Sequence, residues 1–213
     1  MAKDIKIADN RLLNRRLFLQ GTGISLAILT PRRALAQDRD RAGSVEDVKG
    51  EAFAKAGSEH RNLNAAAPVF IKDQVGTGQS SRLTMRLGRD TVLRMGESAL
   101  VTIDRFLMEA GGEITLDAGP ILFDRPAGSK PLPIQIRSPF CLIAVRGTRF
   151  FAGPSNGVFG VFAERGRVDV SAAGRRVTLR AGEGVNITRP GGIPLGPRPW
   201  TLIRIRAALA SVE

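Results

Sequence analysis

The chain has 213 residues and a formal net charge of +12, with one cysteine (Cys141), one tryptophan (Trp200) and no tyrosine. A single cysteine excludes an intramolecular disulfide framework and a cysteine-based metal site, and so few aromatic rings leave little material for stacking sugars or bases. The length suits one domain with a sizeable core.

Residues 1–36 have the layout of a secretory signal. Arg15 and Arg16, followed by Phe18 and Leu19, precede a short apolar run and a small-x-small site that ends at Ala34-Leu35-Ala36. The paired arginines indicate the twin-arginine route. We therefore predict cleavage after Ala36 and a periplasmic mature protein. The apolar run has about ten residues, half of what a transmembrane helix needs, so we expect no membrane span in the mature chain.

Loss of the signal changes the charge argument. It holds seven of the 32 basic and two of the 20 acidic residues, so the mature chain carries a net charge of +7. Outside the cytoplasm the polyanions are lipid headgroups and acidic glycans rather than nucleic acid. We expect the charges to be scattered over a solvated surface. The expected partner is an envelope protein or an anionic envelope polymer, and not a nucleic acid.

After a disordered leader at 37–43, residues 44–189 show glycine-punctuated runs typical of short β-strands. Leu83, Met85 and Leu87 alternate with polar residues and predict a strand, which a turn at 88–90 joins to a returning strand at 91–95. The runs 121–123 and 141–145 are apolar at every position, which predicts interior strands covered on both faces.

These patterns predict an all-β domain. Two architectures stay open, a β-solenoid-like stack of coils and a β-sandwich or jelly roll. Residues 190–213 form a Pro/Gly-rich tie and then a short C-terminal helix at 199–211, which begins at Pro199 and carries Leu202, Ile205 and Leu209 at helical spacing. We expect this helix to cap the sheet.

Five segments in order resemble the FecR domain, the periplasmic sensor module of ferric-citrate-type signalling. The central one, 138–150, is an apolar strand followed by Arg146-Gly147-Thr148 and an aromatic residue, Phe150. The others are Asp-Gln-Val-Gly-Thr-Gly at 73–78, a strand pair at 82–103, a hairpin at 161–170 around Gly166, and Leu-Arg-Ala-Gly-Glu at 179–183 with Gly182.

The resemblance implies envelope sensing, signalling or partner binding, without catalysis. Related anti-sigma regulators resemble a three-part protein with a cytoplasmic segment and a membrane span, in whose place this chain has the predicted signal. The signature residues are expected to be structural, because Gly147 lets the strand kink and Thr148 can bond local backbone. Two alternatives remain: an envelope polysaccharide-binding or polysaccharide-active protein on a solenoid, and an anti-sigma-type regulator that works with a separate membrane partner.

Catalytic, cofactor and metal sites are not indicated by the sequence. The only histidine, His60, lies in a polar segment and has no companion for a nucleophile system or a zinc site. Cys141 lies in an apolar run, so we expect a buried and inert thiol. Carboxylates between Asp104 and Asp124 could act in pairs, as in glycan hydrolases, but the sequence selects no pair.

Overall fold

A computed structural model describes residues 40–107, 110–130, 132–145 and 147–213. The predicted signal residues Arg15, Arg16, Phe18, Leu19, Ala34 and Ala36 lie outside the described residues, as does Arg146. Of the leader expected at 37–43, the described part begins at Asp40 and enters a strand at Arg41. No described helix is long and apolar enough to cross a bilayer.

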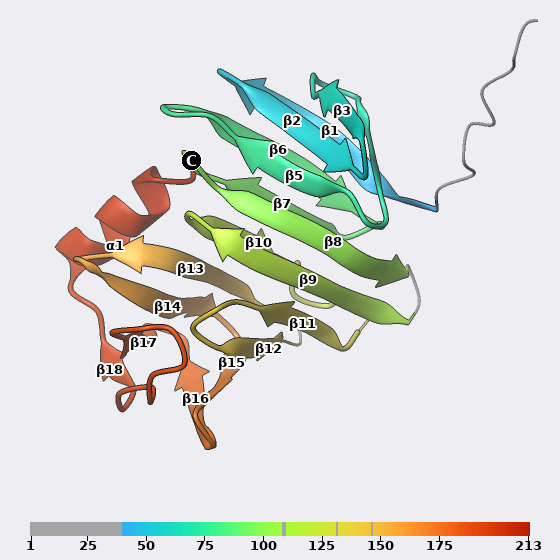
Figure 1. The fold of residues 1–213 in the computed structure, drawn as a ribbon. Helices are drawn as coiled ribbons and strands as arrows, with labels where there is room; N and C mark the ends of the chain where they lie inside the picture. Colours follow the sequence, from blue (N-terminus) through green and yellow to red (C-terminus); the bar gives the residue numbers. More distant parts are fainter. Residues whose placement is uncertain (1–39, 108–109, 131, 146) are drawn as a thin grey trace, which may run out of the picture. The chain divides into compact units, whose positions relative to one another are not determined.

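The described strands form two sheets of nine strands each (Figure 1). Sheet 1 contains, in spatial order, β18 (Arg198–Pro199), β17 (Glu183–Ile187), β14 (Val158–Arg165), β13 (Arg149–Ser155), β10 (Ile121–Asp124), β7 (Thr91–Met95), β6 (Arg82–Leu87), β1 (Arg41–Lys49) and β4 (Pro68–Phe70). Sheet 2 contains β16 (Arg175–Arg180), β15 (Arg167–Ala172), β12 (Leu142–Val145), β11 (Ile134–Arg137), β9 (Gly111–Ala118), β8 (Leu100–Leu107), β5 (Gln74–Thr77), β2 (Ala52–Ala56) and β3 (Glu59–Asn62). The helix α1 spans Leu202–Ala210.

The chain passes repeatedly between the two sheets as it advances. A hairpin in one sheet, such as β6–β7, is followed by a hairpin in the other, such as β8–β9, and β11–β12, β13–β14 and β15–β16 continue the alternation. Described pairings are antiparallel apart from that of β9 with β11. The all-β prediction is confirmed. The fold has features of both architectures that the sequence left open. It has two facing sheets, as a sandwich has, and its chain progresses from one end of the sheets to the other, as in a solenoid.

The core lies between the two sheets. Side chains from sheet 1, such as Met85 and Phe123, and from sheet 2, such as Ile114 and Ile143, belong to one buried apolar cluster. The predicted alternation holds in β6, where Leu83, Met85 and Leu87 are at most 1% exposed. Each such leucine contributes about 1.5–3 kcal/mol through burial. Period-two patterning therefore places one face of each strand in a shared interior.

Helix α1 covers part of the outer face of sheet 1, as predicted, but the predicted start at Pro199 is wrong, because Pro199 pairs in β18 and the helix begins at Leu202. The side chain of Thr201 caps its first turn by accepting a hydrogen bond from the Arg204 amide at 3.4 Å. A second buried cluster joins the helix and the chain beside it to the sheet, and its members are Leu122, Phe151, Phe162, Trp200, Ala208 and Val212. The spacing argument is wrong in one detail, because Leu202 is 71% exposed while Ile205 and Leu209 pack on the cluster.

The two runs predicted to be buried on both faces differ in the structure. Strand β10 is covered on both sides, since Ile121, Leu122 and Phe123 are fully buried and Leu122 packs under the second cluster. Strand β12 is not: Ile143 and Val145 face the core, whereas Leu142 and Ala144 are partly exposed on the outer face of sheet 2. Burial of an outer face depends on a covering element, which β10 has and β12 lacks.

The hairpin expected at 161–170 is also corrected. Strand β14 belongs to sheet 1 and β15 to sheet 2, so the chain changes sheets at Gly166. Gly166 has φ +83°, and a Cβ added there would lie 2.7 Å from the Cγ2 atom of Thr148. Only glycine fits a crossing with that backbone conformation and so close a neighbour.

Candidate functional site

The described signature residues lie at the crossings between sheets. Gly147 has φ +61° just before β13, and Thr148 is fully buried beside Gly166. Phe150 is fully buried and packs against Phe123, with ring centroids 5.3 Å apart. Gly182 has φ +87° in the turn from β16 to β17. These positions shape the turns between the sheets or pack in the core, and the structural role of the signature stays a prediction.

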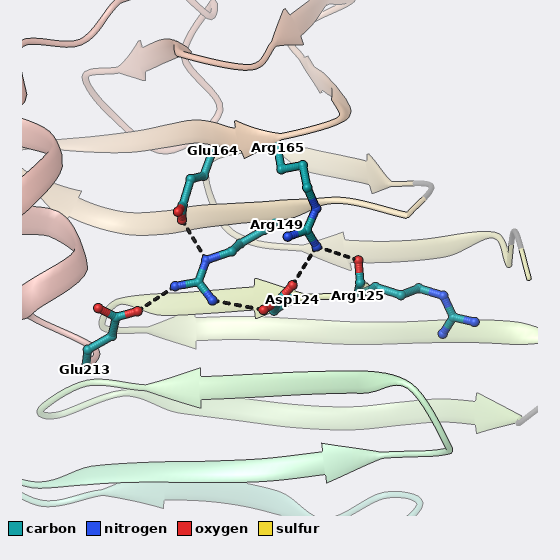
Figure 2. A network of polar contacts seen from close by, with 6 residues as sticks. All are labelled: Asp124, Arg125, Arg149, Glu164, Arg165 and Glu213. Atoms are coloured by element: carbon teal, nitrogen blue, oxygen red, sulfur yellow. Dashed lines mark hydrogen bonds and ion pairs between the residues drawn. The ribbon is translucent and has the colours of Figure 1, made fainter. Parts of the chain in front are cut away.

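A network of ion pairs, centred on Arg149, lies directly after the signature turn (Figure 2). The Arg149 guanidinium donates to Asp124 Oδ2 at 2.9 Å, to Glu164 Oε2 at 2.7 Å and to Glu213 Oε1 at 2.5 Å. Its side chain is only 16% exposed. One arginine thus joins β10, β13, β14 and the C-terminal residue of the chain.

Arg165 extends the network on the other side of Asp124. It donates to Asp124 Oδ1 at 2.8 Å and to the carbonyl oxygen of Arg125 at 2.9 Å (Figure 2). Burial acts to raise the pKa of Asp124, but the hydrogen bonds and positive charges of Arg149 and Arg165 outweigh it and leave this pKa below its ordinary value. The carboxylates around Arg149 raise the pKa of that guanidinium. We call these residues the paired network.

A cavity of about 500 Å³ opens where the Pro/Gly-rich tie meets α1. The Trp200 ring packs closely on the sheet at two glycines. A Cβ added at Gly184 would lie 2.1 Å from the ring, and one added at Gly160 would lie 2.8 Å from it. Arg204 covers the ring from 3.6 Å and donates to Asn186 Oδ1 at 2.8 Å. Burial lowers the pKa of Arg204. With Trp200 only 8% exposed, its ring is a structural anchor rather than a free stacking platform.

A second group of arginines lies on the outer face of sheet 2. Arg167 on β15 and Arg176 and Arg180 on β16 are exposed, and Arg167 is directly opposite Arg180 in the register. Among the described residues, no carboxylate forms an ion pair with any of the three. Arg176 has one weak contact, to Ser171 Oγ at 3.4 Å. We call these three residues the open arginines.

Two concavities lie beside the open arginines. One, of about 490 Å³, is lined by Leu142, Ala144, Arg167, Asp169 and Arg176 with neighbouring residues of β11, β12 and β15. Asp169 accepts a hydrogen bond from Thr178 Oγ1 at 2.6 Å and forms no ion pair among the described residues. The other, of about 420 Å³, is lined by Arg167, Thr178, Arg180, Glu183 and Pro197. Because Arg167 lines both, the hollow surface is continuous around this end of sheet 2.

Catalytic and metal-binding constellations are not found among the described residues. No group of three or more potential ligands is close enough together to hold a metal ion. His60 is exposed and stacks on Phe53, with centroids 5.3 Å apart. Cys141 is buried, as expected, and burial raises the pKa of its thiol to about 11, which disfavours the reactive thiolate.

The described carboxylates that the sequence left open as pairs each have a separate partner. Thr115 donates to Asp104 at 2.7 Å, Thr102 donates to Asp117 at 3.2 Å, Arg137 pairs with Glu113, and Asp124 belongs to the paired network. The last of the set, Glu109, lies outside the described residues. The contacts of the four described carboxylates therefore select no acid–base pair among them.

Sequence reasoning missed both arginine groups. Charge is uneven along the chain: residues 166–213 hold eight arginines and three acidic residues, whereas residues 40–165 hold sixteen basic and fourteen acidic residues. This asymmetry is visible in the sequence and could have indicated the open arginines. Nothing local indicates the paired network, because its members are far apart in the chain.

Comparisons with known proteins agree with the resemblance read from the sequence. Residues 73–169 match the family model described as "FecR protein". Two crystal structures from Parabacteroides distasonis ATCC 8503, each described as a "putative anti-sigma factor", share the fold. The first has 15% identity and a TM-score of 0.51 over 64% of this chain and 64% of that chain. The second has 14% identity and a TM-score of 0.53 over 64% of this chain and 63% of that chain. The match thus spans less than two thirds of these proteins. A comparison with curated proteins gives no match.

Proposed function

We propose, from the premise that residues 73–169 of this chain are a FecR domain, that the protein is a non-catalytic sensing module of envelope signalling that works by binding a partner protein. The observation that carries this proposal is the pairing of a FecR domain with a hollow surface on which the three open arginines outnumber the carboxylates Asp169 and Glu183 and form no ion pair among the described residues. Charged groups left without internal partners on a hollow surface are typical of recognition sites.

Export is the second part of the proposal. FecR domains are typically periplasmic sensors, and the signal predicted at residues 1–36 would deliver this one through the twin-arginine route. The test is N-terminal sequencing of the protein from periplasmic and cytoplasmic fractions. We expect a terminus at Gln37 in the periplasm, and retention of Met1 in the cytoplasm when Arg15 and Arg16 are both replaced by lysine. An intact Met1 terminus in periplasmic wild-type protein would overturn cleavage.

Partner binding is tested by crosslinking the tagged full chain in cells and identifying the captured envelope proteins. We expect one protein at fixed stoichiometry, and no turnover when the purified protein is incubated with peptidoglycan or acidic glycans. Cleavage of either polymer with turnover would replace the proposal by an enzyme.

An anti-sigma-type role with a separate membrane partner is the second candidate. It is favoured by the structural likeness to the two Parabacteroides distasonis proteins, which extends to about two thirds of each. The same crosslinking experiment separates the candidates, because this role requires a captured protein that spans the inner membrane.

A further inference from the structure

Strand β16 is an open edge. Among the described strands it is the terminal one of sheet 2, it pairs only with β15, and its six residues make it the longest of the four edge strands, the others being β3, β4 and β18. Every second residue from Arg176 to Arg180 is exposed, while Val177 and Leu179 are buried. An open edge of this length can accept a further strand.

The backbone amides of β16 are oriented to pair with a further strand. The Arg180 amide donates to Glu183 Oε2 at 2.8 Å instead of to β15, so it points away from the sheet. Backbone groups alternate along a strand with a period of two, so the amides of Thr178 and Arg176 point the same way. Glu183 already meets one outward amide with a carboxylate, which leaves the next two for a ligand.

The positive charge on the outer face of β16 determines which kind of additional strand can pair with it. Arg176 and Arg180 lie on this edge, and Arg167 faces Arg180 from β15 without an ion-pair partner in the described chain. The carboxylate between them on β15, Asp169, accepts from Thr178 Oγ1 at 2.6 Å, so the face keeps an excess of arginine. Like charges directly opposite in a sheet are destabilising, whereas opposite charges stabilise it. A second copy of β16 would bring arginines against arginines, so self-pairing is disfavoured. A strand with carboxylates on its outer face is favoured.

The concavities point to a peptide rather than a sugar. The linings around Arg167 and the two β16 arginines contain no aromatic ring, which sugar stacking requires. They do present the half-exposed apolar side chains of Leu142 and Ala144. Apolar contacts beside unpaired arginines suit a peptide that mixes acidic and apolar residues.

We propose that β16 is the docking edge for an extended acidic segment of a partner protein, which joins sheet 2 as a tenth strand. Its carboxylates lie opposite Arg176 and Arg180 on the outer face, and its alternate apolar side chains extend the core beside Val177 and Leu179. This inference rests on the proposed function and names the chemistry of the partner.

The test measures binding of a capped hexapeptide of alternating glutamate and valine to the full mature chain by titration calorimetry. Saturable binding is expected, and it should weaken with added salt. Arg176→Glu combined with Arg180→Glu should weaken it at least about tenfold and should favour the matching lysine–valine peptide. Lys49→Glu combined with Arg89→Glu changes the net charge equally at exposed sites on β1 and the β6–β7 turn, and should leave affinity within about twofold.

Substitutions at Thr178 distinguish binding by strand addition from binding by charge attraction alone. Thr178→Pro removes an outward amide that the sheet does not use, so the fold should persist, as circular dichroism would check, while binding is lost. Thr178→Val keeps the amide and should bind normally. Independently of folding, the peptide N-methylated on alternate amides should lose affinity for the wild-type chain when the methyl groups face β16.

Two results would overturn the inference. If the N-methylated isomers and the parent peptide bind with equal affinity, charge attraction acts without strand addition. If polygalacturonate binds more tightly than the peptide, and with the same affinity to wild type and to Thr178→Pro, the surface binds glycans. The proposed function is tested separately. If wild type and the Arg176→Glu, Arg180→Glu variant crosslink the same envelope protein equally, docking on β16 is wrong while partner binding stands.

Discussion

Arg165 and Arg167 are two residues apart in the chain and belong to opposite kinds of surface. Arg165 joins the paired network on sheet 1, where it bonds Asp124, whereas Arg167 is one of the open arginines on sheet 2. The cause is the sheet crossing at Gly166, which sends the two side chains to different faces. The paired network uses carboxylates from several elements of the fold, whereas the open arginines form no ion pair among the described residues. Substitutions should separate these roles.

The largest loss of stability is expected for Arg149→Met. This change removes the centre of the paired network and leaves Asp124, Glu164 and Glu213 without their shared cation. Breaking one side of a largely buried ion pair costs about 3 kcal/mol of unfolding free energy. Urea denaturation would measure it. The matched change Arg176→Met should stay within about 0.5 kcal/mol, and equal losses for the two would erase the distinction between the groups.

Asp124→Asn tests the network from its acidic side. The amide keeps one acceptor oxygen where the carboxylate offers two, turns an NH2 group toward the other guanidinium and carries no charge for Arg149 and Arg165, so we expect a loss of about 2 kcal/mol at neutral pH. Thermal and urea unfolding at pH 7 give the value. A neutral outcome would mean that solvent, rather than Asp124, satisfies the two guanidinium groups.

The difference in unfolding free energy between wild type and Asp124→Asn should change with pH in one direction. The folded-state pKa of Asp124 lies below its ordinary value of 3.8. The stability that it contributes is therefore fully present above the unfolded-state pKa and is lost as the pH falls through the folded-state value. The gap in unfolding free energy between wild type and Asp124→Asn should be constant from pH 7 to about pH 5 and should shrink below pH 4. A gap that widens in acid would contradict the network.

Local pattern was enough to predict the parts of the fold that depend on neighbours in the chain. The β6–β7 hairpin, the buried run at 121–123 and the C-terminal helix follow from alternation, apolar runs and helical spacing, respectively. The open outer face of β12 could not be predicted in this way. Its sequence is as apolar as that of β10, and only the position of α1 over one of them decides which is covered.

The candidate site is harder still to predict from sequence. Asp124 and Glu213 lie 25 and 64 residues from Arg149, so only the tertiary fold brings the three together. For the open arginines the charge balance gave a usable signal, since residues 166–213 carry a clear basic excess. Which of those arginines share a face depends on the strand register, and this register is a property of the folded sheets.

A smaller effect is expected for Glu213→Gln. Glu213 is 44% exposed on the side chain, and its contact with Arg149 ties the end of the chain to the sheet. A pair this exposed is worth about 0.5–1 kcal/mol. A double-mutant cycle with Arg149→Met would check it, because Glu213→Gln should add nothing once the arginine is gone. An undiminished second loss would place Glu213 in a different interaction.

The smallest effect, with the opposite sign, is expected for Arg180→Thr. Arg180 is directly opposite Arg167 in the strand register, and no carboxylate of the described chain forms an ion pair with either of them. Threonine relieves this repulsion and has a high strand propensity, while the backbone amide at position 180 keeps its bond to Glu183. We therefore expect a gain of about 0.2–0.5 kcal/mol in unfolding free energy, largest at low salt, together with weaker peptide binding. A variant that gains stability while it loses affinity would show that arginine at this position serves recognition rather than folding, whereas a loss above about 1 kcal/mol would move Arg180 into the same class as Arg149.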